Sequence, residues 1–283
     1  ADVRYSAAGA LGRLGNASSA VVQRLMGLLQ DPQANVRASA AYALGSLDNA
    51  PSAVVQGLLG LLQDPQANVR ASVADALVRL GNASSAVVQG LLGLLQDPQD
   101  YVRYSAADAL GRLGNASSEV LQGLLELLQD PQESVRYSAA DALGRLGNAS
   151  LAVVQGLLEL LQDPQQSVRS NVADALGSLG NASSAVLQGL LGLLQDPQDY
   201  VRSCAADALG RLGNASSEVL QGLLGLLQDP QDYVRSRAAE ALGKLGKRDE
   251  TVLPVLVQWL EQSAPEDSAG YGVDVLWAIV VGE

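Results

Sequence analysis

Acidic side chains recur at one fixed interval and are the first candidates for chemistry. Asp108, Asp141, Asp174, Asp207 and Glu240 are spaced by 33 residues within helical patterns. Since packed helices lie roughly 8–10 Å apart, neighbouring carboxyl groups could stand at the separation found in inverting glycosidases. A column of like residues, however, gives no carboxyl group an environment that makes one an acid and the next a base. We therefore interpret the column as a solvated face.

Other catalytic and metal-binding patterns are missing from the sequence. It contains no histidine, so Ser-His and Cys-His nucleophile pairs cannot form. Cys204 is the one cysteine, which excludes an internal disulfide and is compatible with a reducing, cytoplasmic compartment. We interpret it as a serine-like surface variant. No zinc-protease, paired-cysteine, EF-hand or phosphate-loop motif occurs, and we expect no enzyme activity, no cofactor and no metal.

The charge balance argues against nucleic acid and membranes as partners. Thirty acidic and eighteen basic residues give a formal net charge of −12, and the two lysines, Lys244 and Lys247, cannot form a basic stripe along the chain. No run approaches the roughly 18 apolar residues that span a bilayer, and no signal peptide precedes the first repeat.

A three-residue motif, Asp-Pro-Gln, recurs every 33 residues. It begins at Asp31, Asp64, Asp97, Asp130, Asp163, Asp196 and Asp229. Such a period is typical of stacked units that bury their hydrophobic faces against their neighbours. We predict one elongated domain over 1–283, with a half repeat at 1–15, seven regular repeats at 16–246 and a divergent C-terminal capping repeat at 247–283. The opening half repeat leads us to expect a fragment of a longer protein, able to self-associate through that open edge.

Each regular repeat predicts two helices. In Glu119–Gln129 the apolar residues fall on one broad arc, with Ser117 or Ser118 as the expected N-cap, and Asp130-Pro131 then breaks the helix. The second helix ends at Gly147, where we expect a left-handed backbone. The six Asn-Ala-Ser triplets match the glycosylation acceptor pattern, but their place between helices favours helix capping.

Glycines inside the first helices lower helix propensity, so they require a reason. Gly123 flanks the apolar arc, where a small residue lets the adjacent helix approach. Gly93 lies on the exposed side, where packing gives no reason for glycine.

The repeat resembles the HEAT-repeat family, especially the short HEAT-like repeats of phycobilisome lyases and of artificial binding scaffolds. The shared motif is an Asp in the turn, then Val-Arg, then an Ala-rich run ending Ala-Leu-Gly, here Asp97, Val102-Arg103 and 106–111. The resemblance implies an all-α, right-handed α-solenoid, here of about eight and a half antiparallel helix pairs, whose second helices line a concave face. It also implies a structural ladder between neighbouring repeats, made by Asp64, Arg70, Asp97, Arg103, Asp130, Arg136, Asp163, Arg169, Asp196 and Arg202.

Comparison of the repeats with one another shows which residue positions vary. The variable positions share one side of the second helix with Tyr101, Tyr104, Ser105, Asp108 and Arg112. We call this side, with its counterparts in other repeats, the second-helix face. A fixed scaffold with one varied face is typical of a modular binding protein, although drift of unconstrained surface positions is the alternative.

We therefore predict a non-catalytic scaffold that binds a basic or mixed-charge protein or peptide through this face. The predicted partner-binding residues are Tyr101, Tyr104, Asp108, Tyr137, Asp141, Asp174, Tyr200, Asp207, Tyr233 and Glu240. Asp174 is expected to be the most acidic point, because Ser178 stands where other repeats have a cation. Two alternatives stay open: a sensor or spacer array of a larger enzyme, such as a bacterial signalling NTPase, and an engineered repeat scaffold.

Overall fold

The computed structural model describes residues 2–15, 18–262 and 266–281. These residues form seventeen α-helices and one short 3-10 helix, with no strand among them. The helices are α1 (Asp2–Arg13), α2 (Ser19–Leu28), α3 (Ala34–Gly45), α4 (Ser52–Leu59), α5 (Ala67–Arg79), α6 (Ser85–Leu94), α7 (Asp100–Leu113), α8 (Ser118–Leu127), α9 (Glu133–Leu146), α10 (Leu151–Glu159), η1 (Leu160–Gln162), α11 (Gln166–Leu179), α12 (Ser184–Leu193), α13 (Asp199–Leu212), α14 (Ser217–Leu226), α15 (Asp232–Gly246), α16 (Val252–Gln262) and α17 (Glu266–Val281).

The helices follow the predicted order. A single helix, α1, precedes eight pairs in which the even-numbered helix comes first and the odd-numbered helix second. The prediction of an all-α solenoid of eight and a half pairs is therefore confirmed.

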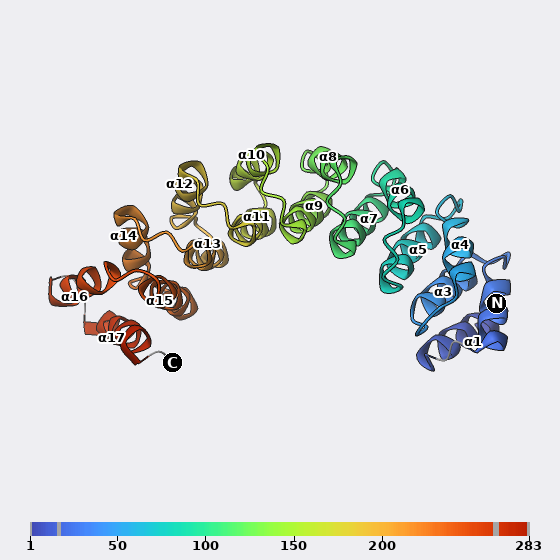
Figure 1. The fold of residues 1–283 in the computed structure, drawn as a ribbon, viewed down its shortest axis with the longest axis horizontal. Helices are drawn as coiled ribbons and strands as arrows, with labels where there is room; N and C mark the ends of the chain where they lie inside the picture. The colour runs from blue at the N-terminus through green and yellow to red at the C-terminus, as the bar shows by residue number, and fades with distance from the viewer. Residues whose placement is uncertain (1, 16–17, 263–265, 282–283) are drawn as a thin grey trace. The chain divides into compact units, whose positions relative to one another are not determined.

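The chain divides into two compact units, residues 1–146 and 147–283. In the first unit the second helices α1, α3, α5, α7 and α9 lie side by side in one layer, and α2, α4, α6 and α8 form the other (Figure 1). In the second unit α11, α13, α15 and α17 form one layer and α10, α12, α14 and α16 the other (Figure 1).

Small residues bring the second helices into close contact. A Cβ added to Gly111 would lie 2.7 Å from the Cα of Ala142 on the next second helix, and one added to Gly45 would lie 2.5 Å from the Cα of Ala76. At these two positions glycine permits the close approach, because the facing atoms belong to the backbone, which cannot swing away. The same repeat position holds the buried Val78 in α5, so the repeat does not demand glycine there in every copy.

The glycines of the first helices behave as the sequence predicts. A Cβ on Gly123 would lie 2.7 Å from Cδ1 of Leu95, so this glycine admits the neighbouring helix. Around Gly93 no atom comes within 4 Å of such a Cβ, and packing does not explain this glycine.

The loops between repeats differ in one respect from expectation. Ser117 is the N-cap residue of α8, but its side chain makes no capping hydrogen bond. Asn115 accepts a hydrogen bond from the Ser117 N–H at 3.0 Å instead, so the asparagine shapes the turn that leads into the helix. The second helix α9 ends as predicted, with Gly147 at a φ of 67°.

Candidate functional site

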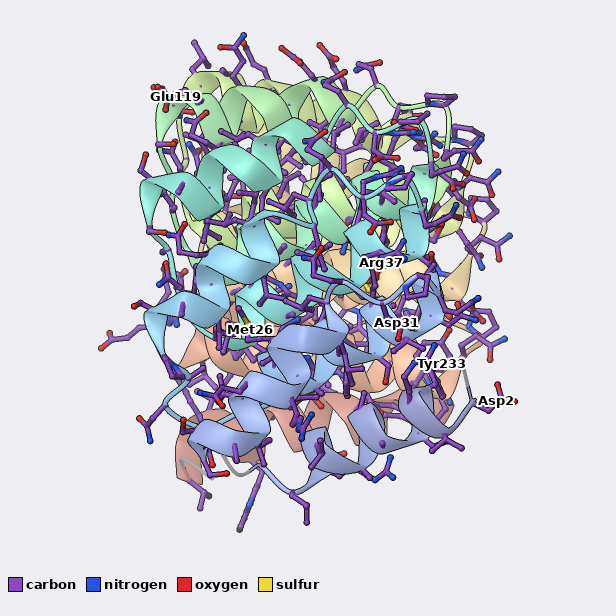
Figure 2. All side chains as sticks on the ribbon, turned by 90° about the vertical axis from the view of Figure 1, so that its right-hand side faces the viewer. Asp2, Met26, Asp31, Arg37, Glu119 and Tyr233 are labelled. Carbon is purple, nitrogen blue, oxygen red and sulfur yellow. The ribbon has the colours of Figure 1, made fainter. Side chains whose placement is uncertain are left out.

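A ladder of buried ion pairs joins consecutive repeats. Arg37 donates to both carboxylate oxygens of Asp64, from Nε at 2.7 Å and from Nη2 at 2.8 Å. Its Nη1 donates to the carbonyl of Asp31 at 2.8 Å, and Figure 2 shows these two residues side by side. Each arginine therefore links the turn of its own repeat to the aspartate of the next repeat.

The same arrangement recurs in both units. The pairs are Arg4–Asp31, Arg37–Asp64, Arg70–Asp97 and Arg103–Asp130 in the first unit, and Arg169–Asp196 and Arg202–Asp229 in the second. Arg136 donates to the carbonyl of Asp130, and Asp163 accepts the N–H of Gln165. An aspartate and the arginine six residues later thus meet through the aspartate's backbone carbonyl, while the carboxylate pairs with the arginine of the preceding repeat.

Burial and pairing act in opposite directions on these aspartates. Burial alone raises the pKa of Asp64, but the hydrogen bonds from Arg37 and from the Gln66 N–H lower the pKa below its usual range. The pKa values of Asp97, Asp130, Asp196 and Asp229 are lowered through the same balance. These carboxylates stay ionised and structural, with little surface to offer a ligand.

A second chain of charges runs across the second-helix face of the first unit. Arg112 lies 3.5 Å from carboxylate oxygens of both Asp75 and Asp108. Arg145 lies 3.5 Å from Asp108 and 2.8 Å from Asp141. Each arginine therefore bridges the aspartate of its own helix and the aspartate of the preceding second helix. These carboxylates are neutralised more completely than pairing within one helix predicts.

The expectation for Asp174 is wrong. Its Oδ1 pairs with Nη2 of Arg211 at 2.6 Å, and the hydroxyl of Ser178 donates to its backbone carbonyl. The cation missing from the Asp174 helix is supplied by the next second helix, because an arginine side chain spans the distance between them. Arg211 and Lys244 both contact Asp207, and Arg237 contacts Glu240 at 2.8 Å.

The predicted tyrosines lie exposed beside these charges. Tyr101 and Tyr104 are on α7, Tyr137 on α9, Tyr200 on α13 and Tyr233 on α15, with 38% to 57% of each residue exposed. Partial burial and the neighbouring Asp199 carboxylate raise the pKa of Tyr233 to about 12, so its phenol remains a hydrogen-bond donor.

Sequence reasoning missed two further tyrosines on the same face. Tyr5 on α1 is 53% exposed, and Tyr42 on α3 is 47% exposed. Tyr5 occupies the repeat position of Tyr104, and Tyr42 that of Asp108. The guanidinium of Arg79 lies over the Tyr42 ring, 4.5 Å from its centre. The repeat register alone could have identified both residues.

Cys204 is not a surface variant, because only 8% of it is exposed. Its repeat position lies between adjacent second helices, as Ser138 shows by donating its hydroxyl hydrogen to the carbonyl of Tyr104 at 3.1 Å. Burial and the nearby Asp174 carboxylate raise the pKa of Cys204 to about 12. A thiol that stays protonated is a poor nucleophile.

Two further observations concern metals and membranes. No group of three or more Cys, Asp or Glu residues suited to a metal ion occurs within the described part of the chain. No described helix combines the length and apolar character needed to cross a bilayer.

Comparison with known proteins agrees with this architecture. The HEAT-repeat model matches residues 1–77, 55–140, 88–164, 121–210 and 187–269, so the chain belongs to the HEAT-repeat family. No curated protein matches it. Among solved structures, an engineered protein is 21% identical with a TM-score of 0.56, over 98% of this chain and 87% of that one.

A natural complex is also similar in fold. It is the complex of CpcE and CpcF of phycocyanin lyase from Nostoc sp. PCC7120, 22% identical with a TM-score of 0.52, over 92% of this chain and 94% of that one. At these identities the likeness concerns the fold alone.

Proposed function

We propose that the protein is a non-catalytic scaffold that binds a protein or peptide through its second-helix face. The observation that carries this proposal is the set of exposed tyrosines on that face, Tyr101, Tyr104, Tyr137, Tyr200 and Tyr233. Tyrosine gives a large contact area at a small cost in side-chain entropy and is enriched among binding hot spots. HEAT-repeat proteins typically mediate protein interactions, and the similar lyase structure is itself a complex of two chains.

The outer side of the first helices offers no comparable surface. Gln122 is exposed there, and its counterparts in the neighbouring repeats are also glutamine. Uniform glutamines give neither aromatic contact area nor a pattern that could distinguish ligands. The variable residues and the aromatic residues thus coincide on one face.

The charges of the second-helix face favour a ligand of mixed charge. Arg112 and Arg145 alternate with Asp75, Asp108 and Asp141 in one connected chain. A ligand that carries both signs can replace these pairs without leaving a charge unpaired. Its association rate should fall as salt rises.

Two matched multiple variants test this function. Serine occupies the positions of all five tyrosines in other repeats, for example Ser134, Ser167, Ser170, Ser203 and Ser236, so replacing the five tyrosines by serine preserves the repeat pattern. The control replaces five exposed glutamines of the first helices by alanine: Gln89, Gln122, Gln155, Gln188 and Gln221.

The probe is a random peptide library displayed against the immobilised protein. Peptides selected on the wild type should bind the tyrosine-to-serine variant at least about tenfold more weakly and the glutamine-to-alanine variant with unchanged affinity. Equal affinity for both variants would move the binding site away from these five tyrosines.

Self-association through α1 is a separate part of the proposal. Val3 on α1 and Leu14, which directly follows it, are 82% and 71% exposed, which is unusual for apolar residues at the edge of a helical stack. Sedimentation equilibrium should show a concentration-dependent increase in mass that Val3→Asp abolishes. A mass that is monomeric at all concentrations would remove this part.

A further inference from the structure

An open hollow lies on the second-helix face of the first unit, over α1, α3 and α5. Its volume is about 820 Å³. The residues that matter for recognition are Tyr5 and Arg13 from α1, Asn35 and Tyr42 from α3, and Asn68 and Ser72 from α5. None of the lining residues is acidic.

Arg13 is the unusual member of this hollow. It occupies the repeat position of Arg79, which pairs with Asp75 at 2.7 Å. Arg112 and Arg145 likewise pair with the aspartate four residues before them. In α1 that place is taken by Gly9, and the guanidinium of Arg13 forms no ion pair with any described residue.

The space of the absent aspartate side chain is open. A Cβ built on Gly9 would meet only Nη1 of Arg13 at 3.6 Å and the hydroxyl oxygen of Ser39 at 3.8 Å. Tyr42 stands at the equivalent position of the next second helix, so that helix supplies no carboxylate there either. The charge chain that continues through Asp75, Asp108 and Asp141 thus lacks its first negative charge.

We propose that this hollow binds an acidic side chain of a partner protein segment, whose carboxylate pairs with Arg13 in the space above Gly9. An apolar residue beside the acidic one packs on the rings of Tyr5 and Tyr42, which are both about half exposed. Asn35 and Asn68 already share a hydrogen bond of 3.2 Å, and their remaining amide groups face a ligand backbone. This assignment rests on the proposed function and specifies one subsite of the same face.

Gly9→Asp tests the subsite from within the repeat pattern. The new carboxylate should pair with Arg13 as Asp75 pairs with Arg79, and α1 should not lose stability, because aspartate also has the higher helix propensity. Arg13→Gln removes the cation instead. Arg24→Gln is the control, because Arg24 is exposed on the first helix α2 and lies outside the hollow.

The probe is again the displayed peptide library. Selection on the wild type should enrich peptides with Asp or Glu beside an apolar residue. These peptides should bind Gly9→Asp and Arg13→Gln about tenfold or more weakly, and Arg24→Gln with unchanged affinity.

Each other outcome overturns the assignment. If acidic peptides bind Gly9→Asp as tightly as the wild type, their binding site lies outside the hollow, and the proposed function then stands without this subsite. Enrichment of peptides without acidic residues has the same meaning. If N-acetyl-aspartate amide displaces these peptides as well as an unlabelled acidic peptide does, the hollow recognises a bare carboxylate rather than a protein segment. If no peptide is enriched on the wild type, both the subsite and the proposed function fail.

Discussion

The ladder aspartates should contribute far more to stability than the aspartates of the exposed charge chain. Asp97 and its partner Arg70 have side chains that are 5% and 12% exposed, and Asp97 accepts two hydrogen bonds from Arg70 and one from the Gln99 N–H. Removing one partner of a buried pair costs about 3–5 kcal/mol, because the other charge is left without compensation.

The substitution Asp97→Asn should fall at the lower end of that range. Asparagine keeps one oxygen that can accept the Gln99 N–H, and Arg70 keeps its hydrogen bond to the Asp64 carbonyl at 2.8 Å. We expect a loss of about 3 kcal/mol. The control is Asp75→Asn, in which the pair with Arg79 is 33% and 38% exposed, so the expected loss is about 0.2–1 kcal/mol.

Native-state hydrogen exchange is the appropriate assay, because repeat arrays do not unfold in a single step. Asp97→Asn should lower the opening free energies of α5, α6 and α7 and leave the second unit unchanged. A loss below 1 kcal/mol, or a loss equal to that of Asp75→Asn, would refute the argument that burial makes the ladder structural.

Three further predictions concern packing and pH. Gly93→Ala should stabilise α6 by up to about 1 kcal/mol in a chemical denaturation series, because the new methyl group meets no atom. Gly111→Ala should instead destabilise the protein, because its Cβ would lie 2.7 Å from the Ala142 backbone. Changes in unfolding free energy of the same sign for both variants would contradict this difference. Leu143→Ala, at a fully buried position, should cost about 2–5 kcal/mol and lower exchange protection mainly in α7–α9, while uniform loss over the chain would contradict local coupling. The folded pKa values of Asp64, Asp97 and Asp130 lie below the unfolded value of about 3.9, so the stability that these carboxylates contribute is complete above that pH and is lost as the pH falls through the folded values. Circular dichroism should show acid unfolding in this window, and unchanged thermal stability down to pH 2 would be contrary evidence.

Much of the fold could be predicted from the sequence because the same local signals recur in successive repeats. The helical periodicity, the Asp-Pro turn and Gly147 each determine a local backbone feature, and local features can be read along one chain. The reason for Gly123 was also accessible, because the glycine lies at the margin of an apolar arc.

Side-chain contacts that depend on how neighbouring second helices are offset could not be predicted from the sequence. Pairing four residues apart predicts the contact of Asp141 with Arg145, but the contact of Asp174 with Arg211 spans 37 residues and two helices. Cys204 was misplaced for the same reason, since its position at the edge of the exposed arc becomes buried only when the preceding second helix packs beside it. The unpaired Arg13 becomes evident only after the partners of its counterparts are known.

The most direct test of binding through the second-helix face is site-specific photocross-linking. A benzophenone amino acid replaces one tyrosine at a time among Tyr101, Tyr104, Tyr137, Tyr200 and Tyr233, and in a parallel series one of the exposed glutamines of the first helices. Each protein is irradiated with a peptide selected on the wild type, and the cross-linked product is measured by mass spectrometry. We predict cross-links from at least one tyrosine position and none from the glutamine positions. Cross-links from the glutamine positions alone would contradict the central claim.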